Sequence, residues 1–582
     1  MHCSGLTSIT IPNSLTSIGA GAFQGCSGLT SISVASSNAK YDSRNNCNAI
    51  IETESNTLLV GCKNTVIPNS VTIIGGDAFH SCKGLTSITI PESVIIIGKA
   101  AFKGCSNLTS ISIPEGVTTI EQTAFENSGL MSITIPNSVT TLGKNAFEDC
   151  DNLTSAILGN GLTKISRSTF VDCTALASVV IGNSVTSIER SAFSKCVKLE
   201  SIVIPNNVTT IDDDAFDRCS GLQSVFIGKG LKSLDEGAFD QCSNISSIIV
   251  DKDNLWLDSR NGCNAIIETA SNTLIYGCKK TIIPDDVVGI GPVAFWHCDG
   301  LTSISIPNSV TSIGERAFGG CSGLTKAEFA SIESLCGISF DDNESNPLYY
   351  AHHLFIDGQE VKDVVIPGSV TFIGNYAFSG CSSLTSITIP ESVTSIGSGA
   401  FGGCTALPVI DNVRYAGTYL IEAVDKTQST YNIKEGTRFI GEAAFSGCSS
   451  LTSVTIPNTV ITIGAMAFGW CALEKVYCYA TEAPCCGEYI SFDYHFGVFD
   501  NTQIVNATLY VPESSVNAYK AADQWKEFGN IVAIDPTGVE ELKASGVNKE
   551  DNISVYDLNG RRLTEKPKSG YYIQDGKIYL AK

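Results

Sequence analysis

Residues 301–323 read LTSISIPNSVTSIGERAFGGCSG, and stretches close to this one recur along the whole chain. Within it, Ile304 and Ile306 alternate with Ser303 and Ser305, as the side chains on the two faces of a β-strand do. The proline that follows the second isoleucine ends this strand, because proline cannot donate to a ladder of hydrogen bonds. The first half of the stretch therefore predicts a short strand with one apolar and one polar face.

The second half of the stretch predicts a return into the core. A second apolar run, Val310 to Ile313, precedes Ala317, Phe318 and Cys321. Alone, such a unit cannot bury its apolar side, but stacked copies of it can. We therefore expect the stretch to form one turn of a solenoid.

Phenylalanine marks the period of the repeat. Most successive anchors are 23 residues apart, and four longer steps each read as two turns, the second with an insertion. This count predicts about twenty turns in one elongated array. The anchors are Phe23, Phe79, Phe102, Phe125, Phe147, Phe170, Phe193, Phe216, Phe239, Phe295, Phe318, Phe378, Phe401, Phe445 and Phe468.

Each of the four insertions reads as a β-hairpin, with two apolar runs around a turn. The first two, YDSRNNCNAIIETESNTLLVGCKNTVIP and LDSRNGCNAIIETASNTLIYGCKKTIIP, are near copies that begin 216 residues apart, at 41 and 257. This offset indicates that a block of about nine turns has been duplicated. The insertions occupy 41–68, 257–284, 346–367 and 413–433.

The hairpin turns are predicted from residues that favour them. Asp357-Gly358 and Asp425-Lys426 mark the turns of the third and fourth insertions. In the first insertion the matching isoleucine and leucine runs centre the turn on Ser55. These turns decide which residues face each other across each pair of strands.

Cysteine is frequent, with 23 in 582 residues. Most cysteines occupy the repeat position three residues after the phenylalanine, where a side chain directed into a packed core suits a buried free thiol. Two pairs in the first two hairpins are predicted to face each other directly. For these, a disulfide and two packed thiols both remain open. The pairs are Cys47 with Cys62 and Cys263 with Cys278.

The composition excludes several classes of function. With 37 Lys and Arg against 59 Asp and Glu, the net charge is −22, so no broad cationic face is expected to bind nucleic acid. The sequence contains no run of eighteen apolar residues, so no transmembrane segment is predicted. The histidines have no nucleophile at a recognised spacing and the cysteines no C-x-x-C pairing, so we expect no enzyme activity, cofactor or metal.

The repeat, the CNAIIET hairpin and the YYAHHL segment of the third insertion resemble the BspA-like leucine-rich-repeat surface proteins of Bacteroides-type bacteria and some mucosal protists. The resemblance covers roughly residues 1–535. It implies a β-rich leucine-rich-repeat solenoid with a parallel sheet on one face. It also implies a location at the cell surface, in the outer membrane, or outside the cell.

The sequences at the two ends of the chain predict how it divides into domains. The first six residues match the end of one repeat and the start of the next, so we expect a truncated start without a signal peptide. Residues 509–534 resemble the cap of such arrays, with one amphipathic helix around Val516–Phe528. The segments at 553–563 and 569–582 are similar to type IX secretion sorting modules. The predicted domains are a solenoid at 1–508, a cap at 509–535, and a linker with a small β-rich sorting or attachment tail at 536–582.

The outward strand positions hold the candidate ligand-binding residues. In most turns these two positions are Ser or Thr, but in five consecutive middle turns one of the two becomes apolar. Two interpretations remain open: β-branched residues favour strands in any case, or the column contacts a ligand. We expect this sheet to line the inner face of the solenoid. The apolar residues are Ile157, Val180, Val203, Phe226 and Ile249.

An extended surface without catalytic groups, together with the family resemblance, favours a binding function. We expect a monomeric surface or secreted adhesin that engages host extracellular-matrix or surface proteins, glycans, or other microbial surfaces. The alternative is a structural spacer or coat component of the cell envelope without a specific ligand. A spacer needs no distinctive face, so the apolar column argues for binding.

Overall fold

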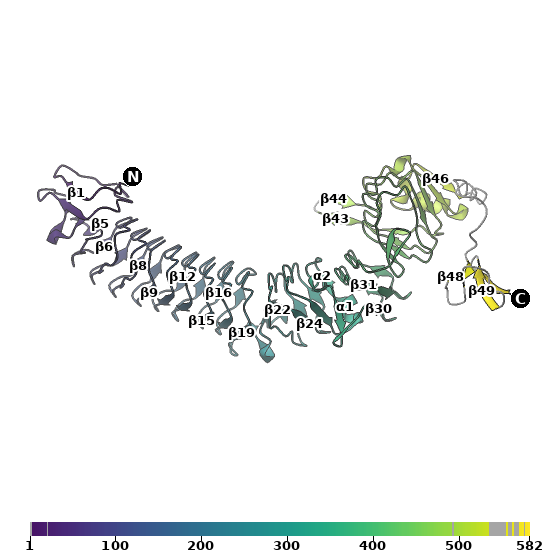
Figure 1. The fold of residues 1–582 in the computed structure, drawn as a ribbon, viewed down its shortest axis with the longest axis horizontal. Helices are drawn as coiled ribbons and strands as arrows, with labels where there is room; N and C mark the ends of the chain where they lie inside the picture. Colours follow the sequence, from purple (N-terminus) through teal and green to yellow (C-terminus); the bar gives the residue numbers. More distant parts are fainter. Residues whose placement is uncertain are drawn as a thin grey trace.

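The computed structural model describes residues 3–19, 21–491 and 494–534, and the strands of the tail. The chain forms an arched solenoid (Figure 1). A regular turn contributes one strand of about four residues and one of two residues, and each pairs in parallel with its counterpart in the next turn. The predicted β-rich solenoid with a parallel sheet is confirmed, and the two-residue strands add a second parallel sheet.

We call the longer strands, which have three or four residues, the four-residue strands, and most of them begin at the serine of the repeat. In β24 (Ser303–Ile306), the two isoleucines are buried and the two serines exposed, as the alternation predicts. The other strands of this kind are β1 (Ser8–Ile11), β2 (Ser31–Val34), β9 (Ser132–Ile135), β11 (Ser155–Leu158), β13 (Ser178–Val180), β15 (Ser201–Ile204), β17 (Ser224–Ile227), β19 (Ser247–Val250), β26 (Lys326–Phe329), β30 (Asp363–Val365), β32 (Ser386–Thr388), β37 (Thr430–Asn432), β39 (Ser453–Ile456) and β41 (Lys475–Cys478).

The two-residue strands form the second parallel sheet, and each ends in a residue whose side chain usually enters the core. They are β6 (Ile73–Ile74), β7 (Ile96–Ile97), β8 (Thr119–Ile120), β10 (Thr141–Leu142), β12 (Lys164–Ile165), β14 (Ser187–Ile188), β16 (Thr210–Ile211), β18 (Ser233–Leu234), β23 (Gly289–Ile290), β25 (Ser312–Ile313), β27 (Ser339–Phe340), β31 (Phe372–Ile373), β33 (Ser395–Ile396), β38 (Phe439–Ile440), β40 (Thr462–Ile463) and β42 (Cys485–Cys486).

The phenylalanine anchors stack on one another between the insertions. From Phe79 to Phe239, successive ring centroids lie 5.0 to 5.4 Å apart and the rings are within 8° of parallel. Rings of this size contribute the largest buried apolar area in each turn. The stack therefore fixes the register of one turn on the next.

The repeat cysteines are buried free thiols over almost the whole ladder, as predicted. Nine of the described ladder thiols donate to the carbonyl of the phenylalanine in the preceding turn, as Cys105 Sγ does to Phe79 O at 3.1 Å and Cys196 Sγ to Phe170 O at 3.2 Å. A weak donor thus partners a carbonyl buried in the core. The thiol has a polar role as well as a packing role.

The phenylalanine turn is hydrogen-bonded to its neighbours as closely as the strands are. The Phe102 N–H donates to the Ala124 carbonyl of the next turn at 2.7 Å, and the Phe193 N–H to the Ala215 carbonyl at 2.8 Å. In the regular turns that the structure describes, no bulky helix separates neighbouring turns on this side, so the four-residue strands are not forced to the inside of the curve.

The expectation that the four-residue strands line the inner face is wrong. In Figure 1, β9, β15 and β19 lie along the lower, convex edge of the arch. The residues of the repeat show which side chains share a face. They do not show which face lies on the concave side of the arch, because the curvature depends on how closely successive turns approach each other on each side.

The first two hairpins replace a turn and join the short-strand sheet. β4 (Ala49–Glu52) and β5 (Thr57–Gly61) are antiparallel, and β5 then pairs in parallel with β6. β21 (Ile266–Glu268) and β22 (Thr273–Tyr276) repeat this arrangement before β23. Each is preceded by a strand and a single 3-10 turn, which are β3 (Tyr41–Asp42) with Arg44–Asn46 and β20 (Leu257–Asp258) with Arg260–Gly262.

The third insertion follows the prediction and the fourth does not. β28 (Leu354–Ile356) and β29 (Gln359–Glu360) turn at Asp357-Gly358, both at positive φ. β35 (Val413–Ala416) and β36 (Tyr419–Ala423) turn at Gly417-Thr418 instead of Asp425-Lys426. Gly417 supplies the positive φ that a two-residue turn needs. Helices α1 (Ile332–Gly337) and α2 (Leu348–Ala351) precede the third hairpin, and β34 (Val409–Ile410) precedes the fourth.

The cysteine pairs of the first two hairpins do not face each other, and all four cysteines are free thiols in the structure. A bulge between the two isoleucines of β4 shifts the register by one residue. Cys62 Sγ consequently lies 3.5 Å from the Asn48 carbonyl, and Cys47 packs in a different core cluster from Cys62. The same bulge in β21 offsets Cys263 from Cys278.

The array closes with two more strands of the long sheet, β45 (Thr508–Val511) and β46 (Asn530–Ala533). The single helix expected around Val516–Phe528 is wrong in length. Helix α3 (Val516–Ala521) stops early, and a separate 3-10 turn, Trp525–Glu527, follows it. This break buries Tyr519 and Trp525 in the core with their rings at 82° to each other.

The tail contains a four-stranded antiparallel sheet in the order β48-β47-β49-β50. Its strands are β47 (Val555–Tyr556), β48 (Arg562–Leu563), β49 (Gly570–Gln574) and β50 (Lys577–Ala581), and a further hairpin, β43 (Tyr489–Ser491) with β44 (Tyr494–Phe496), precedes the cap. The linker predicted to begin at 536 lies outside the described residues up to 554.

The burial of the thiols predicts a selective pattern of alkylation. Iodoacetamide at pH 8 is expected to modify Cys3 and Cys485 in the native protein, because these two cysteines are exposed. The buried ladder thiols react only after denaturation, since burial raises the pKa of the Cys82 thiol to about 11 and that of Cys298 to about 12. Peptide mass spectrometry measures the labelling, and equal labelling of all cysteines would contradict a packed thiol ladder.

Candidate binding surface

The five apolar residues predicted from the sequence lie at equivalent positions of successive strands. Ile157 pairs with Val180, and Val203 pairs with Phe226, which pairs in turn with Ile249. We call these five residues the apolar column. The five residues form two groups of paired residues, one on each side of a gap in the strand pairing between β13 and β15.

That gap interrupts the ladder but does not separate the strands. β13 belongs to one sheet with β9 and β11, and β15 to another with β17 and β19. The Glu200 N–H still donates to the Ala177 carbonyl at 3.4 Å, just before the two strands. The column therefore consists of a pair and a triplet of paired residues, placed in adjacent turns.

The exposure of the column is high for aliphatic side chains. Ile157 is 48% exposed, Val180 55%, Val203 59% and Ile249 52%. Phe226 is half-buried, because it lies in register between two branched neighbours. Contiguous exposed apolar patches are typical of interaction surfaces in proteins.

A column of serines runs beside the apolar column. Ser155 pairs with Ser178, and Ser224 pairs with Ser201 on one side and Ser247 on the other. Serine hydroxyls donate and accept hydrogen bonds. The surface thus offers one apolar and one hydrogen-bonding row at strand spacing.

A second exposed apolar group escaped the sequence analysis. Leu255 is 77% exposed and Trp256 40%, at the start of the second hairpin, with Lys232 Nζ 5.1 Å from the Trp256 ring centre. The residues 216 positions earlier are Ala39 and Lys40. A position-by-position comparison of the two copies of the duplicated block reveals this difference in the sequence.

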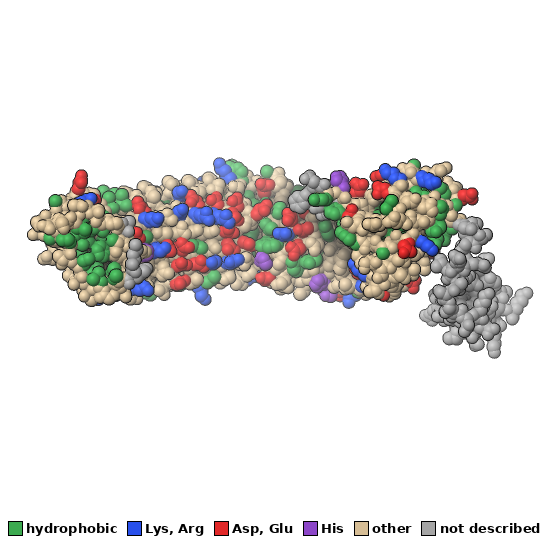
Figure 2. All heavy atoms as spheres, turned by 90° about the horizontal axis from the view of Figure 1, so that it is seen from above, with side chains coloured by type: hydrophobic (Ala, Val, Ile, Leu, Met, Phe, Trp, Pro, Cys, Tyr) green, Lys and Arg blue, Asp and Glu red, His purple; other side chains and the backbone are tan. Residues whose placement is uncertain are grey.

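The opposite, concave side of the arch is charged. Figure 2 shows rows of acidic and basic side chains across the middle of the array. Ion pairs join successive turns in this part of the chain, such as Lys195 with Asp172 at 2.9 Å. Burial raises the pKa of Asp212, and the nearby carboxylates of Asp235 and Glu189 raise it further. Carboxylates stacked at strand spacing thus repel one another.

The described histidines form contacts with nearby side chains or backbone groups. His80 Nδ1 lies 2.8 Å from Asp77 Oδ1, and His353 Nδ1 lies 2.7 Å from Glu360 Oε1. Among the described residues no three His, Cys, Asp or Glu side chains are grouped so that they could hold a metal ion. In the same part of the chain, no helix has the length and apolar character to cross a membrane.

Comparison with solved structures finds similar chains in several bacteria. A leucine-rich repeat protein from Bacteroides ovatus is 26% identical over 81% of this chain and 86% of its own, with a TM-score of 0.32. A leucine-rich cell surface protein from Faecalibacterium prausnitzii is 24% identical over 64% and 92%, with a TM-score of 0.33. A leucine-rich repeat protein from Eubacterium ventriosum is 22% identical over 51% and 85%, with a TM-score of 0.31.

A search of curated proteins finds no match. The family model for the BspA-type leucine-rich repeat region, in contrast, matches six copies. The matches cover residues 1–53, 49–177, 140–260, 267–346 and 351–474. These ranges include the apolar column and most of the array. The chain belongs to the BspA-type leucine-rich repeat family.

Proposed function

We propose that this protein is displayed at the cell surface and binds a partner protein through the apolar column. The observation that carries the proposal is the row of five outward apolar residues in consecutive turns, four of them 48 to 59% exposed. The description of the Faecalibacterium protein as a cell surface protein supports the location. The tail at 536–582, by its resemblance to sorting modules, supplies the attachment.

The chemistry of the column favours a protein over a glycan as the partner. Four of its five side chains are aliphatic, whereas sugar rings are usually recognised through aromatic faces and clustered polar groups. Covering a half-exposed valine or isoleucine contributes roughly 1 kcal/mol. The serine row beside it satisfies polar groups of the partner, which keeps the desolvation cost low. A host matrix or surface protein, or a protein of another microbe, fits this surface.

Phe226 is the anchor of the proposed interface. Its ring is held between Val203 and Ile249 in the same sheet, so little conformational freedom is lost on binding. Aromatic residues at the centre of an interface are the common hot spots. Phe226 is also the only aromatic residue of the column.

Replacing Phe226 and Val203 together by threonine is expected to weaken binding at least about tenfold without lowering stability. Both changes restore the polar pattern of the other turns and leave the inward-facing residues untouched. Binding to purified extracellular-matrix proteins and to epithelial cells measures the effect. Val365→Thr is the matched control, because Val365 is 68% exposed at the corresponding position of β30, outside the column.

The outcomes separate the hypotheses. If the double change leaves binding intact while trimming of the hairpins at 346–367 or 413–433 abolishes it, recognition belongs to the insertions. If the intact protein binds none of the tested surfaces, the spacer hypothesis replaces the adhesin hypothesis. An equal loss with Val365→Thr would show that any outward valine contributes, and would contradict a localised site.

A further inference from the structure

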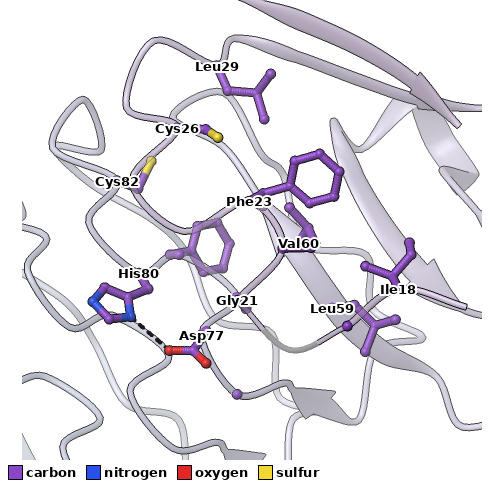
Figure 3. A pocket seen from close by; sticks show the side chains of 16 residues that line it. Ile18, Gly21, Phe23, Cys26, Leu29, Leu59, Val60, Asp77, His80 and Cys82 are labelled. Carbon is purple, nitrogen blue, oxygen red and sulfur yellow. Dashed lines mark hydrogen bonds and ion pairs between the residues drawn. The ribbon is translucent and has the colours of Figure 1, made fainter. Parts of the chain in front are cut away.

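A cavity of about 250 Å³ lies between the first turn and the first hairpin (Figure 3). Its lining residues include Phe23, Cys26, Val60, Phe79 and Cys82. The stack of phenylalanine rings described above begins at Phe79. The cavity therefore lies where the stack would otherwise continue toward the first turn.

The duplicated block shows what fills the equivalent space. The residue 216 positions after Val60 is Tyr276, and the residue 216 positions after Phe23 is Phe239. The Tyr276 ring lies 5.5 Å from the Phe239 ring. Its hydroxyl donates to the Phe239 carbonyl at 3.0 Å. A phenol ring thus occupies this space in the second copy.

Val60 is too short to do the same in the first copy. Phe23 and Cys26 are only half-buried, whereas Phe239 is 1% and Cys242 5% exposed. The glycine that follows is the same in both copies: a Cβ on Gly61 would meet the Phe79 ring at 2.1 Å. The backbone and the far wall of the space are therefore preserved, and the missing group is the ring.

The size and polarity of the cavity suit a single aromatic ring. An apolar cavity of ~150 Å³ is large enough to bind benzene, and this one is larger. The Phe23 carbonyl accepts the Cys26 N–H at 3.1 Å. A carbonyl has two lone pairs, and the corresponding carbonyl of Phe239 uses the second one to accept the tyrosine hydroxyl.

The polar side chains beside the cavity differ between the two copies, although Gln24 corresponds to another polar residue, Asp240. His80 Nδ1 lies 2.8 Å from Asp77 Oδ1 and 2.8 Å from Gln24 Nε2 (Figure 3). The corresponding residues of the second copy include Val293 and Trp296, in place of the aspartate and the histidine. In the first copy, side chains with hydrogen-bonding groups thus form part of the cavity wall.

We propose that this cavity binds a single aromatic ring that carries a hydroxyl group, a ligand of the phenol class. The ring lies against Phe23, as Tyr276 lies against Phe239. The hydroxyl donates to the Phe23 carbonyl. The site is independent of the apolar column.

The probe is p-cresol, which has the structure of the tyrosine side chain. The full chain is titrated with p-cresol by isothermal calorimetry and by ligand-observed NMR, and saturable binding at one site is expected. Toluene, which lacks the hydroxyl, is expected to bind about 2–10-fold more weakly because it leaves the carbonyl without a second donor.

Two substitutions at equivalent positions make the test specific. Val60→Tyr places the ring covalently in the cavity, so p-cresol affinity is expected to fall at least about tenfold and the melting temperature to rise. Tyr276→Val opens the same space in the second copy, so a second binding site is expected. Circular dichroism checks that each variant is folded. If Val60→Tyr does not fold, Val60→Phe is used in its place.

Failure of the intact protein to bind p-cresol would overturn the proposal. So would p-cresol binding that Val60→Tyr and Val60→Phe leave unchanged, because the probe would then bind elsewhere. A gain of binding in Tyr276→Val, together with its loss in Val60→Tyr, supports the cavity as the site in both copies.

Discussion

Replacing Phe193 by alanine is expected to lower the free energy of unfolding by about 3–5 kcal/mol. The ring is fully buried, and it stacks on Phe170 at 5.4 Å and on Phe216 at 5.2 Å. The substitution removes both contacts and leaves a cavity in the middle of the array. Denaturant titration followed by circular dichroism measures the loss.

The matched control is Phe23→Ala, which changes the same residue type at the same repeat position. Phe23 is half-buried beside a cavity, so its removal is expected to cost about 1–2 kcal/mol. Equal losses in the two variants would contradict the view that the stacked rings determine the stability of the array.

Deletion of residues 199–221, one whole turn, is expected to leave a folded protein. The deletion joins two turns with the same register, so Phe193 can stack on Phe239 in place of Phe216. This turn lies within the regular part of the array, where serine pairs with serine in successive strands. Circular dichroism and the cooperativity of thermal unfolding measure the result.

Deletion of the eleven residues 199–209 is the contrasting variant. It removes β15 but keeps Phe216, so strands and ring anchors on either side no longer lie opposite their counterparts. We expect loss of cooperative unfolding, because each turn is stabilised only by its neighbours. Equal cooperativity in the two deletions would refute the solenoid register.

The repeat could be predicted because each of its residues has the same surroundings in every turn. Ile304 enters the core and Ser303 faces solvent for the reason that any strand alternates. The phenylalanine ladder follows from the 23-residue period alone. Errors of single-residue assignment are corrected by the other copies.

The insertions were less predictable, because each depends on a local choice of turn. Asp425 suggested a turn, but its carboxylate accepts the Thr427 N–H at 3.0 Å in a loop beyond the hairpin. Gly417, which adopts the positive φ, sets the turn instead. A single bulge in β4 likewise moved Cys47 out of line with Cys62. Neither feature follows from apolar periodicity.

The candidate site, too, could be predicted only in part. The alignment of Val203, Phe226 and Ile249 follows from the period, and the structure confirms it. The half-burial of Phe226 depends on side-chain packing between strands. The cavity beside Val60 depends on the volume of one side chain, and only the comparison with Tyr276 gives it meaning.

The position of the four-residue strands on the convex edge has a consequence for how the molecule meets another surface. A concave face can enclose a rounded object. An arch that approaches a flat surface with its convex edge instead makes its first contact at the lowest point of the curve. The turns of β15 and β19 lie near the lowest part of the arch (Figure 1). The turns near the lowest part of the arch therefore meet such a plane before the turns at either end do.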